Sequence, residues 1–104
     1  MQKNWKLKLR YGKLTTPYSH FTAIAQGIAG QLPDEFSCPP GNAYISMKMW
    51  AENSEQAADM ITVIGGRIGF QVTGKIEVFD TPPEDPPEEQ PYGYSIKFTP
   101  FQDD

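Results

Sequence analysis

The sequence predicts an α+β fold, a two-layer sandwich in which one or two helices cover one face of an antiparallel-rich sheet of four or five strands. The chain has 104 residues, a common length for a single domain. Several segments alternate apolar and polar residues with the period of two that a half-buried strand requires. Residues 53–68 instead repeat their apolar residues with the period of a helix. Because consecutive strands usually pair antiparallel, we expect one domain over residues 1–104.

Residues 5–11 form the first predicted strand. Apolar and basic side chains alternate along it, with Trp5, Leu7, Leu9 and Tyr11 set against Lys6, Lys8 and Arg10. In a strand, this alternation places the apolar set on one face and the cations on the other. Residues 12–17 are predicted to form a turn.

Residues 18–32 allow two interpretations. Their apolar side chains recur at spacings of three and four, and Thr16 and Pro17 suit the start of a helix. Against a helix, Gly27 and Gly30 each cost about 1 kcal/mol relative to alanine. The helix is the favoured interpretation. The alternative is a strand through His20, Thr22 and Ile24.

The middle of the chain is more regular. Residues 33–42 contain too many prolines and glycines for a regular element and are predicted to be a loop. A strand follows over residues 43–51. A helix is predicted after this strand, with Asn53 and Gln56 as a capping pair at its N-terminus. Gly69 is predicted to end the helix in the left-handed conformation. The apolar stripe of this helix consists of Ala57, Ile61, Ile64 and Ile68.

Two more strands are predicted, one through Val72, Gly74, Ile76 and Val78, and one with Tyr94, Ile96 and Phe98 on a single face. The loop between them, residues 81–91, holds five of the ten prolines and four acidic residues. These four acids equal the whole net charge of −4, so the remaining charges balance. Because proline stiffens a segment and like charges extend it, we expect this Pro-acidic loop to project from the domain.

The sequence also bears on the cellular compartment in which the protein is expected. Cys38 is the only cysteine, so no intrachain disulfide can form, and no His/Cys cluster suggests a metal or cofactor site. The first residues lack the apolar run of a signal peptide, and no stretch is long and apolar enough to span a membrane. A cytoplasmic protein with no membrane association is the expectation.

No catalytic residue is assigned from the sequence. His20 and Cys38 resemble a base and a thiol nucleophile, but they lie on separate segments without a surrounding signature. The glycine-rich residues 65–69 end a helix, where the dipole is negative and does not suit phosphate. Glu77 and Asp80 lie near Lys75 on a strand and are interpreted as a solvated face.

The predicted strand phases make the sheet face away from the main helix basic and aromatic. Such faces occur at the cores of protein interfaces, and they also stack single-stranded bases. Together with the Pro-acidic loop, this face supplies the candidate interface residues Lys8, Arg10, Tyr44, Lys48, Trp50, Lys75, Phe79, Glu84, Asp85, Glu88 and Glu89.

The predicted function is that of a non-enzymatic interaction or accessory module that self-associates, with a homodimer as the first expectation. Each loop would contact the outer face of the other subunit at Trp50, because its reach across its own face is expected to be limited. The alternative is binding of single-stranded nucleic acid or another polyanion, against which the pI near 4.9 argues. A weaker alternative is a ligand-binding protein or enzyme with a pocket at His20, Arg67, Tyr92 and Tyr94.

Overall fold

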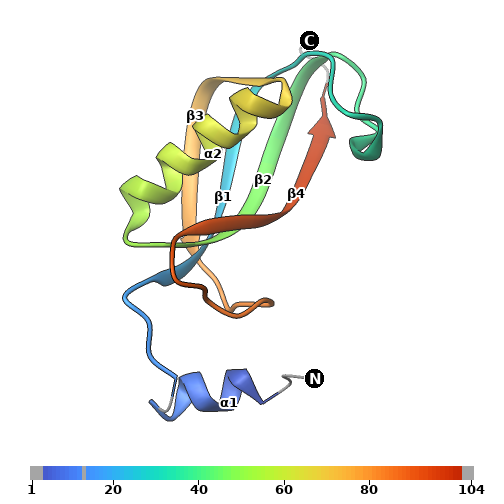
Figure 1. Cartoon of the computed structure of the whole chain (residues 1–104). Coiled ribbons are helices and arrows are strands. Elements are labelled where there is room, and N and C mark those ends of the chain that lie inside the picture. The colour runs from blue at the N-terminus through green and yellow to red at the C-terminus, as the bar shows by residue number, and fades with distance from the viewer. Residues whose placement is uncertain (1–3, 13, 102–104) are drawn as a thin grey trace.

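A computed structural model describes residues 4–12 and 14–101 and shows a four-stranded antiparallel sheet covered on one face by a long helix (Figure 1). The strands are β1 (Ser19–Ala29), β2 (Gly41–Ala51), β3 (Phe70–Asp80) and β4 (Tyr92–Pro100). Their order in the sheet is β3-β1-β2-β4, so the two strands that follow the helix lie at opposite edges. The helix α2 (Ser54–Ile68) packs on β1, β2 and β3. The predicted α+β sandwich is confirmed.

Residues 18–32, for which the sequence favours a helix, contain the central strand β1. The alternative interpretation, a strand through His20, Thr22 and Ile24, is therefore correct. Apart from Phe21, the inward side chains of β1 are small, with Ala23, Ala25 and Ala29 almost fully buried beneath α2. Gly27 belongs to the same inward set, and a Cβ there would lie only 2.1 Å from the carbonyl oxygen of Gln71 on β3. The outward set mixes Ile24 and Ile28 with polar residues, so apolar residues occur on both faces of β1 and the sequence does not show a clear period of two.

The strand predicted over residues 5–11 is wrong. Residues Trp5–Arg10 form a short helix, α1, that lies apart from the sheet (Figure 1). The Lys8 amide donates to the Asn4 carbonyl at 3.1 Å, and the Tyr11 amide donates to the Leu7 carbonyl at 3.0 Å. Leucine, lysine and arginine are all good helix formers, so the local sequence supports this conformation despite its alternation. None of the six residues of α1 is buried.

The helix α2 begins and ends where the sequence predicts. The side chain of Asn53 accepts a hydrogen bond from the Gln56 amide at 2.8 Å. The Gln56 side chain reaches back to the amide of Glu52 at 2.7 Å, one residue earlier than in a standard capping box. At the other end Gly69 has φ +123°, which lets the chain turn sharply into β3.

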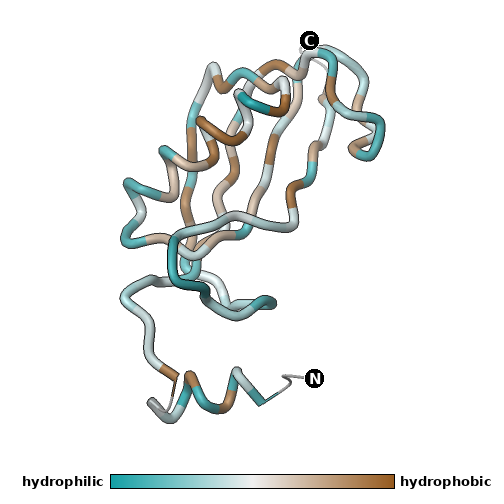
Figure 2. The backbone as a smooth tube through the Cα atoms, viewed as in Figure 1, coloured by the Kyte–Doolittle hydropathy of each residue, from teal (hydrophilic) through white to brown (hydrophobic). Residues whose placement is uncertain are grey.

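The core lies between α2 and the sheet. Ile45, Met47 and Met49 of β2, Ile61 of α2 and Phe70 of β3 are its largest fully buried side chains. Figure 2 shows hydrophobic positions along α2 and the strands that it covers. Over β4, the core is completed by the loop between β1 and β2, where the short 3-10 helix η1 (Asp34–Phe36) lies. There the rings of Phe36 and Phe98 pack edge to face, 5.1 Å apart.

A bulge in β4 places the residues before it on the opposite face from the one that the sequence predicts. Ser46 pairs with Lys97 and Lys48 pairs with Tyr94, so two residues of β4 lie opposite the single residue between Ser46 and Lys48. Ser95, in this bulge, has a left-handed φ of 56°. Tyr94 was predicted to share a face with Ile96 and Phe98, but the bulge places it on the outer face beside Lys48.

Candidate functional site on the outer face of the sheet

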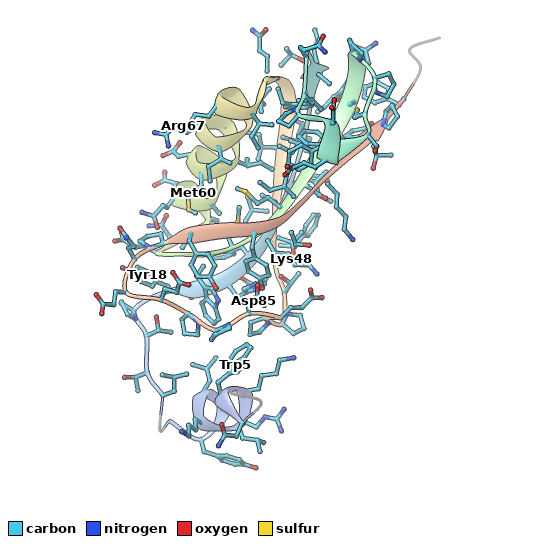
Figure 3. All side chains as sticks on the ribbon, turned by 45° about the vertical axis from the view of Figure 1, so that its right-hand side comes forward. Trp5, Tyr18, Lys48, Met60, Arg67 and Asp85 are labelled. Atoms are coloured by element: carbon cyan, nitrogen blue, oxygen red, sulfur yellow. The ribbon has the colours of Figure 1, made fainter. Side chains whose placement is uncertain are left out.

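The outer face is the sheet surface opposite α2, and the Pro-acidic loop crosses one half of it. This loop joins the two edge strands and therefore passes beneath the ends of β1 and β2 (Figure 3). The expectation that it projects, with limited reach across its own face, is wrong. Trp50 and His20 on that half are only 3% and 6% exposed.

Two aromatic side chains of the sheet donate hydrogen bonds to carbonyl groups of the loop. The Trp50 indole Nε1 donates to the Asp85 carbonyl oxygen at 2.9 Å. The Tyr92 hydroxyl donates to the Pro86 carbonyl oxygen. Burial, followed by the negative charges of Glu88 and Asp85, raises the pKa of Tyr92 to about 12. The phenol therefore keeps its proton and remains a donor at neutral pH.

Tyr94 connects the loop to His20. Its hydroxyl accepts the amides of Glu84 at 3.0 Å and Asp85 at 3.2 Å. The phenol proton is therefore left for Nε2 of His20, 2.6 Å away. The proton of the neutral imidazole then lies on Nδ1, which donates to the Thr81 carbonyl oxygen at 2.9 Å.

The surroundings of His20 favour its neutral form. Burial is the main cause that lowers its pKa, and the positive charge of Lys48 acts in the same direction. The hydrogen bond to Thr81 and the charges of Glu84 and Asp85 oppose this shift. The ring of Trp50 packs against the imidazole, with centroids 5.2 Å apart at 75°. We call His20, Trp50, Tyr92 and Tyr94 the aromatic cluster.

One ion pair supplements these hydrogen bonds. Lys48 Nζ lies 2.6 Å from a carboxylate oxygen of Glu84, next to the aromatic cluster. The hydrogen bond from Lys48, and then its charge, lowers the pKa of the Glu84 carboxyl. Because Glu84 is exposed, this pair is screened by solvent and adds less than the buried contacts.

The hydrogen bonds of the aromatic cluster bear on the chemistry open to His20. Both ring nitrogens of His20 already have protein partners, which leaves neither free for a reacting group. The sequence alternative of a ligand pocket requires four side chains to lie together, and the structure brings three of them together, His20, Tyr92 and Tyr94. Arg67 does not join them, because it lies on α2 at the opposite face of the sheet (Figure 3).

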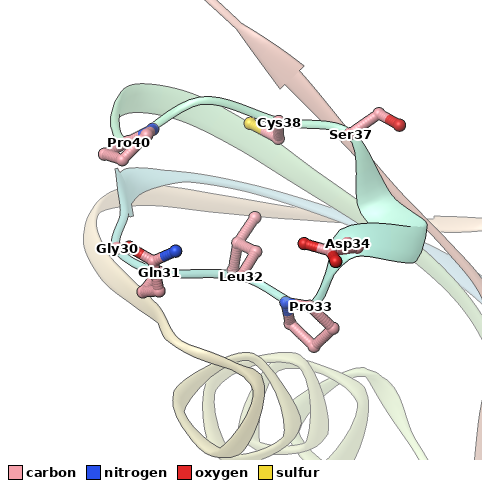
Figure 4. A pocket seen from close by; sticks show the side chains of 8 residues that line it. All are labelled: Gly30, Gln31, Leu32, Pro33, Asp34, Ser37, Cys38 and Pro40. Carbon is pink, nitrogen blue, oxygen red and sulfur yellow. The ribbon is translucent and has the colours of Figure 1, made fainter.

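Cys38 lies far from His20, at the other end of β1. It lines a shallow hollow in the loop between β1 and β2, together with residues 30–34, Ser37 and Pro40 (Figure 4). Its thiol contacts the Pro39 carbonyl oxygen at 3.5 Å. The two residues therefore cannot act as a nucleophile and base in one chain.

The other half of the outer face is open. Ile28 and Tyr44 are 45% and 40% exposed there. Tyr44 packs against Phe101, with ring centroids 4.6 Å apart. A shallow hollow of about 190 Å³ is lined by Ile24, Gln26, Tyr44, Lys75 and Glu77. We call these five residues and Ile28 the open half.

The candidate interface residues divide into three groups. Lys8 and Arg10 lie on α1 and not on the sheet, which corrects their predicted placement. Lys48, Trp50, Glu84 and Asp85 contact one another within the chain. Tyr44, Lys75, Phe79, Glu88 and Glu89 remain exposed.

No protein-family model, curated protein or solved structure matches the chain. Among residues 4–12 and 14–101, no three histidine, cysteine, aspartate or glutamate side chains are grouped in a way that would hold a metal ion. The helices in this described part are too short or too polar to cross a membrane.

Proposed function

We propose that the protein is a self-associating interaction module whose open half packs against the open half of a second copy. The observation that supports this proposal is the unequal covering of the outer face. The chain covers His20 and Trp50 with its own loop, but it leaves Ile28 and Tyr44 about half exposed on the same surface. Exposed apolar side chains that share one surface are typical of protein interaction sites.

The charges of the open half suit pairing between identical copies. Lys75 and Glu77 lie on the same strand and form an exposed ion pair of 3.2 Å. Across a two-fold axis, each could instead pair with the opposite charge of the second copy, since a two-fold interface must be complementary to itself. Tyr44 supplies an aromatic group of the kind enriched at interface cores.

The size of the open half sets the strength of the association. With four strands about 4.8 Å apart and half of each strand uncovered, the open half and the adjoining part of β4 together measure roughly 15 by 18 Å. This is smaller than the approximately 800 Å² that each partner contributes to a standard interface. We therefore expect a weak, reversible dimer with a Kd on the order of 10 to 100 μM.

Polyanion binding receives less support from the geometry. Lys6, Lys8 and Arg10 lie on α1, away from the sheet face that was predicted to carry them. Lys48 and Lys75 are each paired with a glutamate. Lys97, opposite Ser46, is exposed on the outer face without an ion pair in the described part of the chain, and one such lysine gives only a weak positive field.

The proposal is tested with two charge-introducing variants and light scattering. Ile28→Lys lies in the open half, whereas the control Val63→Lys lies on the exposed side of α2, where the wild-type side chain is 50% exposed. At about 100 μM we expect the Val63 variant and the wild type to show the same raised mass, and the Ile28 variant to be monomeric. A monomeric wild type, or an Ile28 variant that keeps the raised mass, would contradict the proposal.

A further inference from the structure

The aromatic cluster contacts the Pro-acidic loop mainly through the loop's main chain. Trp50 and Tyr92 donate to the carbonyl groups of Asp85 and Pro86, and Tyr94 accepts two main-chain amides. Proline-rich segments present carbonyl groups that local structure leaves free, and they lose little conformational entropy on binding. Protein modules that bind such segments use aromatic surfaces of this kind.

The loop has further features of a bound peptide. Pro83 and Pro86 have the P-x-x-P spacing, with Glu84 and Asp85 between them. Pro83 and Pro87 are partly buried, while both acidic residues remain exposed. Lys48, on the sheet beside the cluster, pairs with Glu84 at 2.6 Å and would favour an acid at that position.

We propose that the aromatic cluster and Lys48 form a recognition site for proline-rich acidic peptides, which the chain's own loop occupies when no other ligand is present. The ligand in trans is an extended P-x-x-P segment of another protein with a carboxylate between its prolines. A tethered segment has an effective concentration in the millimolar range, so the loop excludes weak competitors. This proposal concerns the covered half of the face and does not depend on self-association.

The test removes the loop and supplies it again as a peptide. Residues 82–90 are replaced by a glycine–serine linker of equal length, in a Trp5→Phe background that leaves Trp50 as the only tryptophan. A synthetic peptide with the sequence of residues 80–91 is then titrated while the fluorescence of Trp50 is recorded. We expect saturable binding to this variant and no binding to the Trp5→Phe chain that retains its loop.

Two controls define the chemistry of the site. Trp50→Phe keeps an aromatic ring but loses the N–H that donates to Asp85, and its binding, followed by calorimetry, should weaken at least tenfold. A peptide with alanine in place of Pro83, Pro86 and Pro87 should weaken by a similar factor. The Ile28→Lys change in the open half should leave binding unaltered, which separates this result from the oligomer test.

The decisive outcome is obtained with a folded, loop-replaced chain. If its circular dichroism is native and the peptide does not bind at millimolar concentration, the proposal is overturned. If replacement of the loop prevents folding, a variant of the intact chain with alanine at Pro83, Pro86 and Pro87 takes its place, because these changes weaken the loop's own contact by the same factor as in the peptide. This variant should bind the peptide more tightly than the wild type, and equal binding would overturn the proposal.

Discussion

At the scale of residues, His20 connects the loop to the sheet through hydrogen bonds that require its neutral form. A proton on Nε2 would place a second donor against the Tyr94 hydroxyl, which already accepts two amides. The burial that lowers the pKa of His20 acts in the same direction. Protonation should therefore oppose closure of the loop over the aromatic cluster.

This arrangement predicts how stability depends on pH. Since the folded pKa of His20 lies below 6.5, the unfolded chain takes up the proton first as the pH falls. The stabilisation is complete above pH 6.5 and is lost as the pH falls toward the folded pKa. Urea unfolding at intervals from pH 8 to pH 5 measures it, and His20 is the only histidine that can contribute. A free energy of unfolding that rises as the pH falls below 6.5 would show the opposite linkage.

Ser95 provides a second prediction at this scale. Its φ of 56° is costly for a β-branched residue, so Ser95→Val should destabilise the fold by about 1–2 kcal/mol in urea unfolding. Ser95→Gly is the matched control, because glycine adopts this conformation without strain and should change the stability little. Equal losses in the two variants would mean that the left-handed conformation at Ser95 does not determine the cost.

At the scale of elements, the sequence pattern predicts a helix or strand correctly where one face of the element is buried and the other is polar. The helix α2 combines a capping pair, an apolar stripe and a terminal glycine, all of which the structure contains. The same holds for β2, whose buried and exposed residues alternate as predicted along most of its length. The sequence pattern predicts the wrong element at β1, because isoleucines on its outer face obscure the alternation with the mostly small inward residues.

The cap of α2 is tested by removing one side chain. Asn53→Ala eliminates the acceptor for the Gln56 amide and should cost about 1 kcal/mol in the free energy of unfolding. Asn53→Ser retains an acceptor at the same place and should cost much less. An unchanged urea midpoint for the alanine variant would show that this cap contributes nothing to stability.

The exposure of α1 predicts that shortening one of its apolar side chains has little effect on the free energy of unfolding. Leu7 is 51% exposed, so Leu7→Ala should change the free energy of unfolding by less than about 0.5 kcal/mol. Ile61 on α2 is fully buried, and Ile61→Ala should cost about 2–5 kcal/mol in the same measurement. A loss of more than 1 kcal/mol for Leu7→Ala would indicate that α1 packs against the domain.

At the scale of the whole molecule, the outer face could be predicted only in part. The sequence identified Lys48, Trp50 and the acidic loop as features that belong together, and they do contact one another. It assigned these contacts to two subunits, because no local signal shows that a loop folds back across its own sheet. The position of Tyr94 was also hidden, since the bulge at Ser95 breaks the period of two without a glycine to mark it.

The central claim is that the outer face is divided between an intramolecular contact and a surface for a second copy. Amide NMR spectra recorded along a dilution series from about 500 μM to 5 μM test both parts together. Resonances of Ile28, Tyr44 and Lys75 in the open half should shift with concentration, while the Trp50 indole N–H and the amides of Glu84 and Asp85 should not. Shifts confined to Trp50 and the loop, or no shift at any position, would contradict this account.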